Sequence, residues 1–332
     1  VDATGPLTKD DRLLYRLNLS YENSGSFRDF VNNRSVFIAP VVKLNISPQT
    51  QVTAELEYQS FKNVADPGIP NVGNRPADVP RNLFAGEPIN NRNNGDRYFV
   101  GVNWSHMINN DWTISHRLSA ELMDYNSNSL FWFTPATANG SLERFFNNAP
   151  INHSNRYQTS VNLTGHVTTG ILKHTLLFGY DYIFLDDKIK GNNCCASAPA
   201  FNIFNPIYLA GRPILDSSNN SNMGFTQSWH GAYFQDQVKL PYNFHAMGGF
   251  RYDNAVGRNT VTDLTTSAED RFTPRGGLLW QPMPWLSLYG SYTENFCASN
   301  TLFNTDGQGL PPQTAQQWEA GLKTEFLDGR LR

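Results

Sequence analysis

The stretch NRYQTSVNLTGHV, residues 155–167, alternates between two kinds of side chain. One parity carries Tyr157, Val161, Leu163 and Val167, and the even-numbered positions from 156 to 166 are all polar. Successive side chains of a β-strand point to opposite faces, so a period of two residues indicates a strand with one apolar and one polar face. We therefore expect an extended strand here.

The same alternation recurs along the whole chain, giving twelve expected strands. The other eleven are placed near 12–23, 34–46, 51–60, 95–108, 112–122, 172–187, 226–240, 243–256, 271–282, 285–296 and 315–326. Short turns are expected at 47–50, 109–111, 168–171, 240–242, 282–284 and 327–329, and long links at 62–94, 126–154, 188–225, 257–270 and 297–314. A sheet with short turns at one end and long loops at the other is typical of outer-membrane barrels.

The strand parity also predicts which side chains face outward. Outward positions include Leu56, Leu118, Leu163, Phe178 and Leu288, and inward positions include Glu55, Arg117, Arg156, Arg275 and Glu319. Aromatic residues on the apolar parity are expected near strand ends, where a membrane interface would place them. They are Trp104, Trp112, Tyr180, Tyr182, Trp280 and Trp318.

Composition limits the other classes of protein. Of the 332 residues 17% are charged and 13% aromatic, the mean hydropathy is −0.45 and the net charge is −3. No stretch reaches the roughly 18 apolar residues of a membrane-spanning helix, and no basic run points to nucleic acid. A soluble β-sandwich shows the same period, but its strands are usually only about 5–6 residues long. No nucleophile elbow, phosphate loop or paired catalytic constellation occurs, so no catalytic residue is assigned.

Several motifs then resemble one protein family. FTPRGGLLWQP (272–282) and LYGSYTENF (288–296) resemble a signature pair of strands in TonB-dependent siderophore receptors. QQWEAGLKTEFLDGRL (316–331), GGFRYD (248–253), TGPL (4–7) and LLYRLNLSYENSGSFRDF (13–30) are similar to the same family, in the same order. Each motif alone is loose, but together they span nearly the whole chain.

The resemblance implies an all-β fold, a transmembrane antiparallel up-and-down β-barrel of the bacterial cell outer membrane. Such receptors have roughly 22 strands around an N-terminal plug. Residues 1–332 are therefore expected to be a segment of a single barrel domain without the plug domain and the C-terminal strands. The implied function is import of a ferric siderophore, with energy from the inner-membrane protein TonB acting through the plug. Outer-membrane lipid is a further partner, and neither enzymatic activity nor a cofactor is expected. The alternatives are import of another ligand such as cobalamin or a glycan, a passive porin, a barrel enzyme and a soluble β-sandwich adhesin.

The long loops hold the candidate binding residues. In a siderophore receptor, loop aromatic residues hold the chelate by stacking, which makes Trp132, Phe133, Phe201 and Tyr208 candidates; the alternative is that they pack loop against loop. Cys194 and Cys195 are expected to form a disulfide, either with each other or from one of them to Cys297. The seven histidines are scattered without ligand spacing, so no metal site is predicted.

Overall fold

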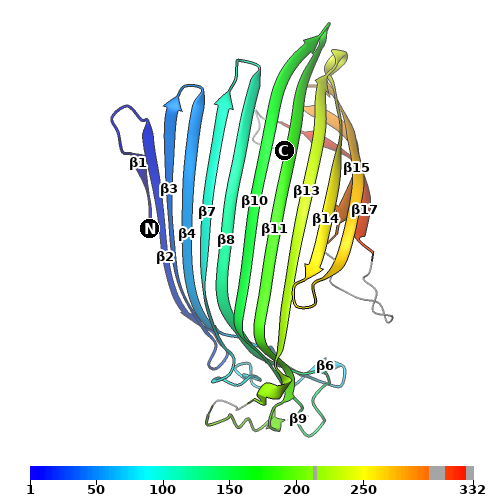
Figure 1. The fold of residues 1–332 in the computed structure, drawn as a ribbon. Helices are drawn as coiled ribbons and strands as arrows, with labels where there is room; N and C mark the ends of the chain where they lie inside the picture. Colours follow the sequence, from blue (N-terminus) through cyan, green and yellow to red (C-terminus); the bar gives the residue numbers. More distant parts are fainter. Residues whose placement is uncertain (212–214, 299–310, 327–332) are drawn as a thin grey trace.

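In a computed structural model the alternating segments form one large curved antiparallel sheet (Figure 1). The structure describes residues 1–211, 215–298 and 311–326. Within these residues the sheet has 13 strands that pair in sequence order. They are β1 (Asp2–Pro6), β2 (Leu13–Gly25), β3 (Asn32–Ser47), β4 (Thr50–Val64), β7 (Arg92–Met107), β8 (Trp112–Phe131), β10 (Phe145–Thr169), β11 (Leu172–Ser197), β13 (Ser221–Lys239), β14 (Phe244–Asn259), β15 (Leu264–Met283), β16 (Leu286–Cys297) and β17 (Gln313–Thr324).

All twelve expected strands are present, and the partial up-and-down barrel is confirmed. One strand was not expected: β1 is short and contains Gly5 and Pro6, both poor strand formers, and it forms the free edge beside β2, where a proline is tolerated. The long link predicted at 257–270 is wrong. There β14 and β15 continue past their expected ends and leave only residues 260–263 between them.

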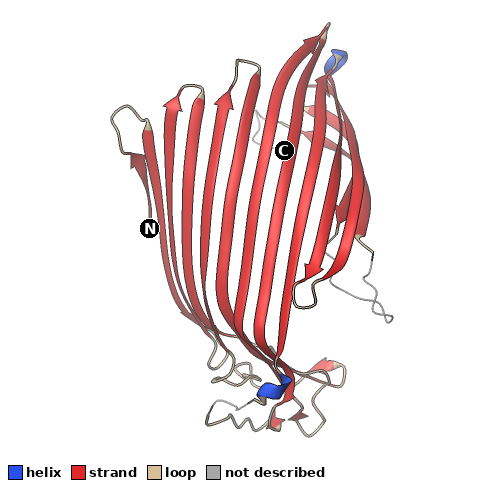
Figure 2. Cartoon of the chain, viewed as in Figure 1, coloured by secondary structure: helices blue, strands red, loops and turns tan. Residues whose placement is uncertain are grey.

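The connections fall at two ends of the sheet (Figure 2). The turns after β3, β7, β10, β13 and β15 all lie at the same end, as predicted, because every neighbouring pair is antiparallel. The turn expected at 327–329 and most of the link at 297–314 lie outside the described residues. The other end carries the long loops, which hold two-stranded ribbons of β5 (Asn71–Val72) with β6 (Arg75–Pro76) and of β9 (Ser141–Leu142) with β12 (Phe201–Asn202).

One face of the sheet is apolar. Residues directly opposite each other on neighbouring strands share a face, and Leu163 lies opposite Ile114 and Phe178, which continue into Phe234 and Phe250. The outward prediction is confirmed for Leu56, Leu118, Leu163, Phe178 and Leu288. No helix among the described residues is long and apolar enough to cross a membrane.

The opposite face is charged, and many of its charges are matched across strands. Arg97 donates to Glu57 at 3.0 Å and to Glu121 at 2.7 Å, which joins β4, β7 and β8. Arg251 on β14 reaches Asp181 on β11 at 2.7 Å by lying over Gly231, where an added Cβ would stand 1.9 Å from the guanidinium. The register also confirms the inward prediction for Glu55, Arg117, Arg156, Arg275 and Glu319.

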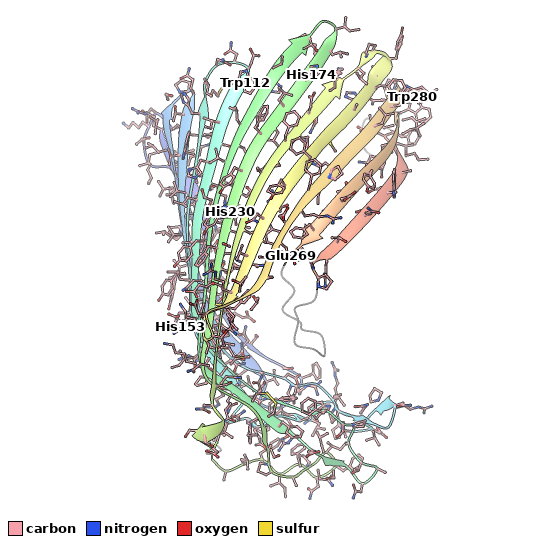
Figure 3. All side chains as sticks on the ribbon, turned by 45° about the vertical axis from the view of Figure 1, so that its right-hand side comes forward. Trp112, His153, His174, His230, Glu269 and Trp280 are labelled. Carbon is pink, nitrogen blue, oxygen red and sulfur yellow. A yellow bond between two sulfur atoms is a disulfide. The ribbon has the colours of Figure 1, made fainter. Side chains whose placement is uncertain are left out.

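Six aromatic residues of the apolar face were expected near strand ends. Trp112 and Trp280 lie near the short-turn end (Figure 3), where Trp280 stacks on Phe244 at 5.5 Å. Tyr180 and Tyr182 were expected near a strand end, but β11 continues to Ser197, so that expectation is wrong for them. Tyr180 is eight residues beyond Leu172, roughly 26 Å along the strand. Because strands of such barrels tilt by roughly 35–45°, this length is about 20 Å across the membrane, and Tyr180 therefore lies within an apolar band about 25 Å tall.

Candidate ligand-capture site

Loops from four connections pack together at the long-loop end. We call segments 26–31, 65–91, 132–144 and 198–211 the cap; the ribbons reach sideways from the strand ends in Figure 3. The buried core of the cap comes from three of these segments, and Val72, Val79, Trp132 and Tyr208 pack against it. The core residues are Ala77, Leu83, Ala85, Ala136, Leu142, Phe201 and Ile203. The cap is thus a folded unit with its own apolar core.

A buried ion pair joins three segments of the cap. Arg144 and Glu87 lie 2.7 Å apart, and each side chain is 1% exposed. The Arg144 guanidinium also donates to the carbonyl oxygens of Ala85 and Gly86, both at 3.1 Å. The second oxygen of Glu87 accepts the backbone N–H of Leu209 at 2.9 Å. Because a buried charge is costly without partners, this pair fixes the three segments relative to one another.

Arg144 also packs on an aromatic ring. Its guanidinium carbon lies 3.9 Å from the centroid of Phe201, which is 2% exposed. Burial lowers the pKa of the Arg144 guanidinium from its ordinary value, and the hydrogen bond to Glu87 opposes that change. A cation held over a ring in a desolvated site gains a further attraction. Phe201 is therefore an internal support of the cap.

The segment between β2 and β3 closes the other side of the cap. The ring of Phe30 lies 6.0 Å from that of Phe84 and 5.1 Å from that of Tyr208. The Tyr208 hydroxyl donates to the carbonyl of Phe84 at 2.8 Å, and burial raises its pKa. Arg28 donates to the carbonyl of Leu83 at 2.8 Å. These contacts join segment 26–31 to segments 65–91 and 198–211 of the cap.

The four predicted binding residues divide into two groups. Three of them pack together in the core of the cap, which is the alternative of loop packing against loop: Trp132, Phe201 and Tyr208. Phe133 is 69% exposed. The centroid of its ring lies 5.0 Å from that of Phe131 and 5.1 Å from that of Phe145, the first residue of β10. Phe133 is therefore the one of the four that presents a large aromatic surface to solvent.

Sequence reasoning missed the residues that build the cap. Glu87, Arg144, Arg28 and Phe84 stand in irregular segments without periodicity, and Glu87 and Arg144 are 57 residues apart. The excess of Asn, Gly and Pro in these segments predicted loops but gave no sign of a shared core. The available signal was the presence of a charged residue, Glu87 or Arg144, next to apolar residues in a long loop, which could have indicated a buried ion pair.

Cys194 and Cys195 are joined in a disulfide on an exposed part of β11. Cys297 is the last residue of β16 and is not a partner in that bond. Within residues 1–211, 215–298 and 311–326, no three His, Cys, Asp or Glu side chains come together as a metal site would require.

Comparison with known proteins gives one consistent family. The family model described as TonB dependent receptor-like, beta-barrel matches residues 41–332. The metal-pseudopaline receptor of Pseudomonas aeruginosa is 27% identical over 348 residues, covering 100% of this chain and 48% of that protein. The ferrioxamine B receptor of Salmonella typhimurium is 24% identical, covering 98% of this chain and 46% of that protein. The chain thus spans about half the length of these relatives.

Solved structures agree on the fold. The outer-membrane ferripyoverdine receptor of Pseudomonas aeruginosa bound to ferripyoverdine superposes with a TM-score of 0.85 at 19% identity, covering 99% of this chain and 44% of that chain. These relatives are receptors of the outer membrane, not enzymes, which agrees with the lack of a catalytic constellation in the sequence. The chain belongs to the TonB-dependent receptor β-barrel family of the bacterial outer membrane.

Proposed function

We propose that the parent protein of this chain imports a ferric siderophore across the outer membrane, with energy delivered by TonB through a plug domain. The observation that carries the proposal is the cap, which places a rigid group of loops with exposed aromatic surface at the long-loop end of a charged barrel wall. A passive porin has no need of a loop assembly fixed by a buried ion pair. The relatives named for ferrioxamine B and ferripyoverdine support iron as the cargo.

A second candidate cargo is a chelate of another metal. The relative named as a metal-pseudopaline receptor is 27% identical to this chain over the whole of this chain. A ligand that binds other metals should therefore be tested beside ferric siderophores. Cobalamin and glycans are less well supported, because the relatives compared above are named for metal-binding chelates. The metal is cargo in each case and needs no resident site in the barrel wall.

Replacing Phe133 with Ala should weaken capture of the chelate. An aromatic contact contributes about 1 kcal/mol beyond the area that it buries, so the Kd should rise about five-fold while the barrel stays folded. The control is Tyr242→Ala, which removes an aromatic residue that is 88% exposed at the short-turn end. Equal affinities for the Phe133 variant and the wild type would remove Phe133 from the capture surface.

Uptake by cells tests the proposed function as a whole. Cells with the parent gene should accumulate radioactive iron from ferric siderophores, and deletion of either that gene or TonB should abolish the uptake. Supplying nickel, zinc or cobalt chelates in parallel distinguishes the second cargo. If every metal chelate were taken up normally without the gene while cobalamin or glycan uptake failed, the metal assignment would be wrong and membership of the receptor family would stand.

A further inference from the structure

A histidine and an aspartate form a pair on the apolar, outward face of the sheet. Asp236 lies directly opposite Leu176, and Phe234 on the same strand as Asp236 lies directly opposite Phe178. Side chains two residues apart on a strand share a face, so Asp236 points outward with Phe234. His174, four residues before Phe178 on β11, points outward as well. Nδ1 of His174 lies 2.8 Å from Oδ2 of Asp236, which places an ionisable pair among apolar side chains.

The pair lies close to the short-turn end of the outward face. His174 is two residues from the start of β11 at Leu172, and Asp236 is three residues from the end of β13 at Lys239. Three residues of a tilted strand rise only about 8 Å, and Figure 3 shows His174 at this end of the sheet. Short turns of outer-membrane barrels face the periplasm, so the pair meets the phospholipid leaflet on that side. Both β11 and β13 have their two neighbouring strands, and this face is turned away from the lumen.

The protein leaves part of the Asp236 carboxylate without a partner. Nε2 of His174 lies 2.7 Å from Oγ1 of Thr169, so both nitrogens of the ring are engaged. The other oxygen of Asp236, Oδ1, is covered by the wall and has no hydrogen-bond partner among the residues that the structure describes. The Asp236 side chain is 24% exposed, and the terminal torsion of an aspartate is soft, so a small rotation brings Oδ1 to the outside. A carboxylate has about four acceptor sites and is costly beside hydrocarbon, so an N–H donor from the lipid would stabilise it.

The backbone beside Asp236 carries no side chains. Gly248 on β14 lies directly opposite Asp236, and Gly276 on β15 lies directly opposite Gly248. A Cβ added at Gly248 would meet no heavy atom within 4 Å, so the space in front of this residue is open. The rings of Phe234 and Phe250, whose centroids are 5.9 Å apart, stand on the side toward the membrane centre. A lipid chain therefore has room to lie against the backbone here, next to the carboxylate.

We propose that Asp236, His174 and Gly248, together called the amine site, bind one phospholipid with a primary-amine headgroup from the periplasmic leaflet. The ammonium group donates to Asp236, which His174 holds in place, and one acyl chain lies over Gly248. The ammonium has three N–H donors for the acceptors that the wall leaves open, and its charge matches the carboxylate. A choline headgroup has the same charge without an N–H, and a glycerol headgroup leaves the lipid anionic. The site does not depend on which cargo the receptor imports.

Phospholipids with matched acyl chains test the amine site on the purified full-length receptor in detergent. Native mass spectrometry counts the bound lipid as phosphatidylethanolamine, phosphatidylcholine or phosphatidylglycerol is added. Wild type should bind one phosphatidylethanolamine about ten-fold more tightly than either of the others, because only this headgroup donates charge-assisted hydrogen bonds to a carboxylate. Asp236→Asn should lose the preference. The control Asp270→Asn makes the same change at an exposed, outward position nearer the other end of β15 and should keep it.

Gly248→Leu is a second variant that leaves the pair intact. The open space should admit the leucine without strain, so the melting temperature without lipid should stay within about 2 °C of wild type. The leucine covers the bare backbone and should weaken phosphatidylethanolamine binding about five-fold. In wild type this lipid should also raise the melting temperature more than phosphatidylcholine does, and in Asp236→Asn it should not.

Three results would overturn the amine site. The first is equal binding of phosphatidylethanolamine and phosphatidylcholine by wild type. The second is tighter binding of phosphatidylglycerol than of either, which would show that the lipid is held by basic groups. The third is an unchanged preference for phosphatidylethanolamine in both Asp236→Asn and Gly248→Leu, which would place the bound lipid elsewhere on the barrel.

Discussion

Replacing Glu87 with Gln should loosen three segments of the cap without unfolding the barrel. The variant leaves the Arg144 guanidinium buried at 1% exposure without a counter-charge, and such a break costs about 3–5 kcal/mol. The amide side chain keeps nearly the same shape, so lost volume does not explain the effect. The cap segments should then open locally, because this pair joins three of them.

Hydrogen exchange of the full-length receptor measures that opening. Amides of segments 65–91 and 198–211 should lose most of their protection, while those of β10 and β11 keep theirs. The control is Arg16→Gln, which breaks an exposed pair with Asp2 on the edge strands and should leave the protection of the cap unchanged. Adding Arg144→Met to Glu87→Gln should restore part of the protection, since no unpaired charge remains. Unchanged protection in the single variant would show that the pair does not hold the cap.

Replacing Leu163 with Arg should destabilise the barrel in lipid by about 2–4 kcal/mol, the range for a basic residue at the bilayer midplane. Leu163 lies between Ile114 and Phe178 on the apolar face, six residues from the end of β10 at Thr169. Neither neighbour offers a partner for a guanidinium, and the side chain is too far from an interface to reach water at no cost.

Thr164→Arg is the matched control, because the next residue points to the charged face. Urea unfolding in lipid vesicles should show a lower midpoint for the Leu163 variant and a midpoint near wild type for the control. A one-residue error in register would reverse the two results. Equal midpoints for the Leu163 variant and wild type would place Leu163 away from lipid.

The period of two residues predicted the part of each strand that crosses the membrane. It did not predict the parts beyond the membrane, where neither face of the strand meets lipid. In segment 155–167 one face of the strand meets lipid and the other faces the lumen, so the alternation is clear. The observed strand β10 begins ten residues earlier, at Phe145. In residues 145–154 the strand extends beyond the apolar band of the barrel, so neither face of the strand has to be apolar. The same holds for β11, which continues to Ser197, and for β14 and β15, whose extensions replaced a predicted loop.

The segment 226–240 shows a second limit of pattern reasoning. Trp229 and Tyr233 lie on the charged face, although both are large aromatic residues. The Trp229 indole donates to Asp253 at 2.7 Å, and the Tyr233 hydroxyl donates to Asn162 at 2.7 Å. Their polar atoms belong to the network of the lumen, so the large aromatic residues of this strand do not all share one face.

The candidate site was predictable only in part, because the cap forms by contacts between distant loops. An excess of aromatic residues made Trp132, Phe201 and Tyr208 binding candidates, with loop packing as the alternative. All three pack in the core of the cap, as that alternative describes. The pairing of Glu87 with Arg144 follows from tertiary packing, which no local pattern encodes.

Equilibrium binding to the purified full-length receptor tests the central claim most directly. Ferric siderophores should quench the intrinsic tryptophan fluorescence with saturable affinity, and the iron-free forms and unrelated solutes should bind much more weakly. That difference is expected because the cap presents a fixed surface to one compact chelate, whereas a flexible iron-free ligand loses more conformational freedom on binding. Equal binding of iron-free and ferric forms, or saturable binding of none of them, would contradict the account.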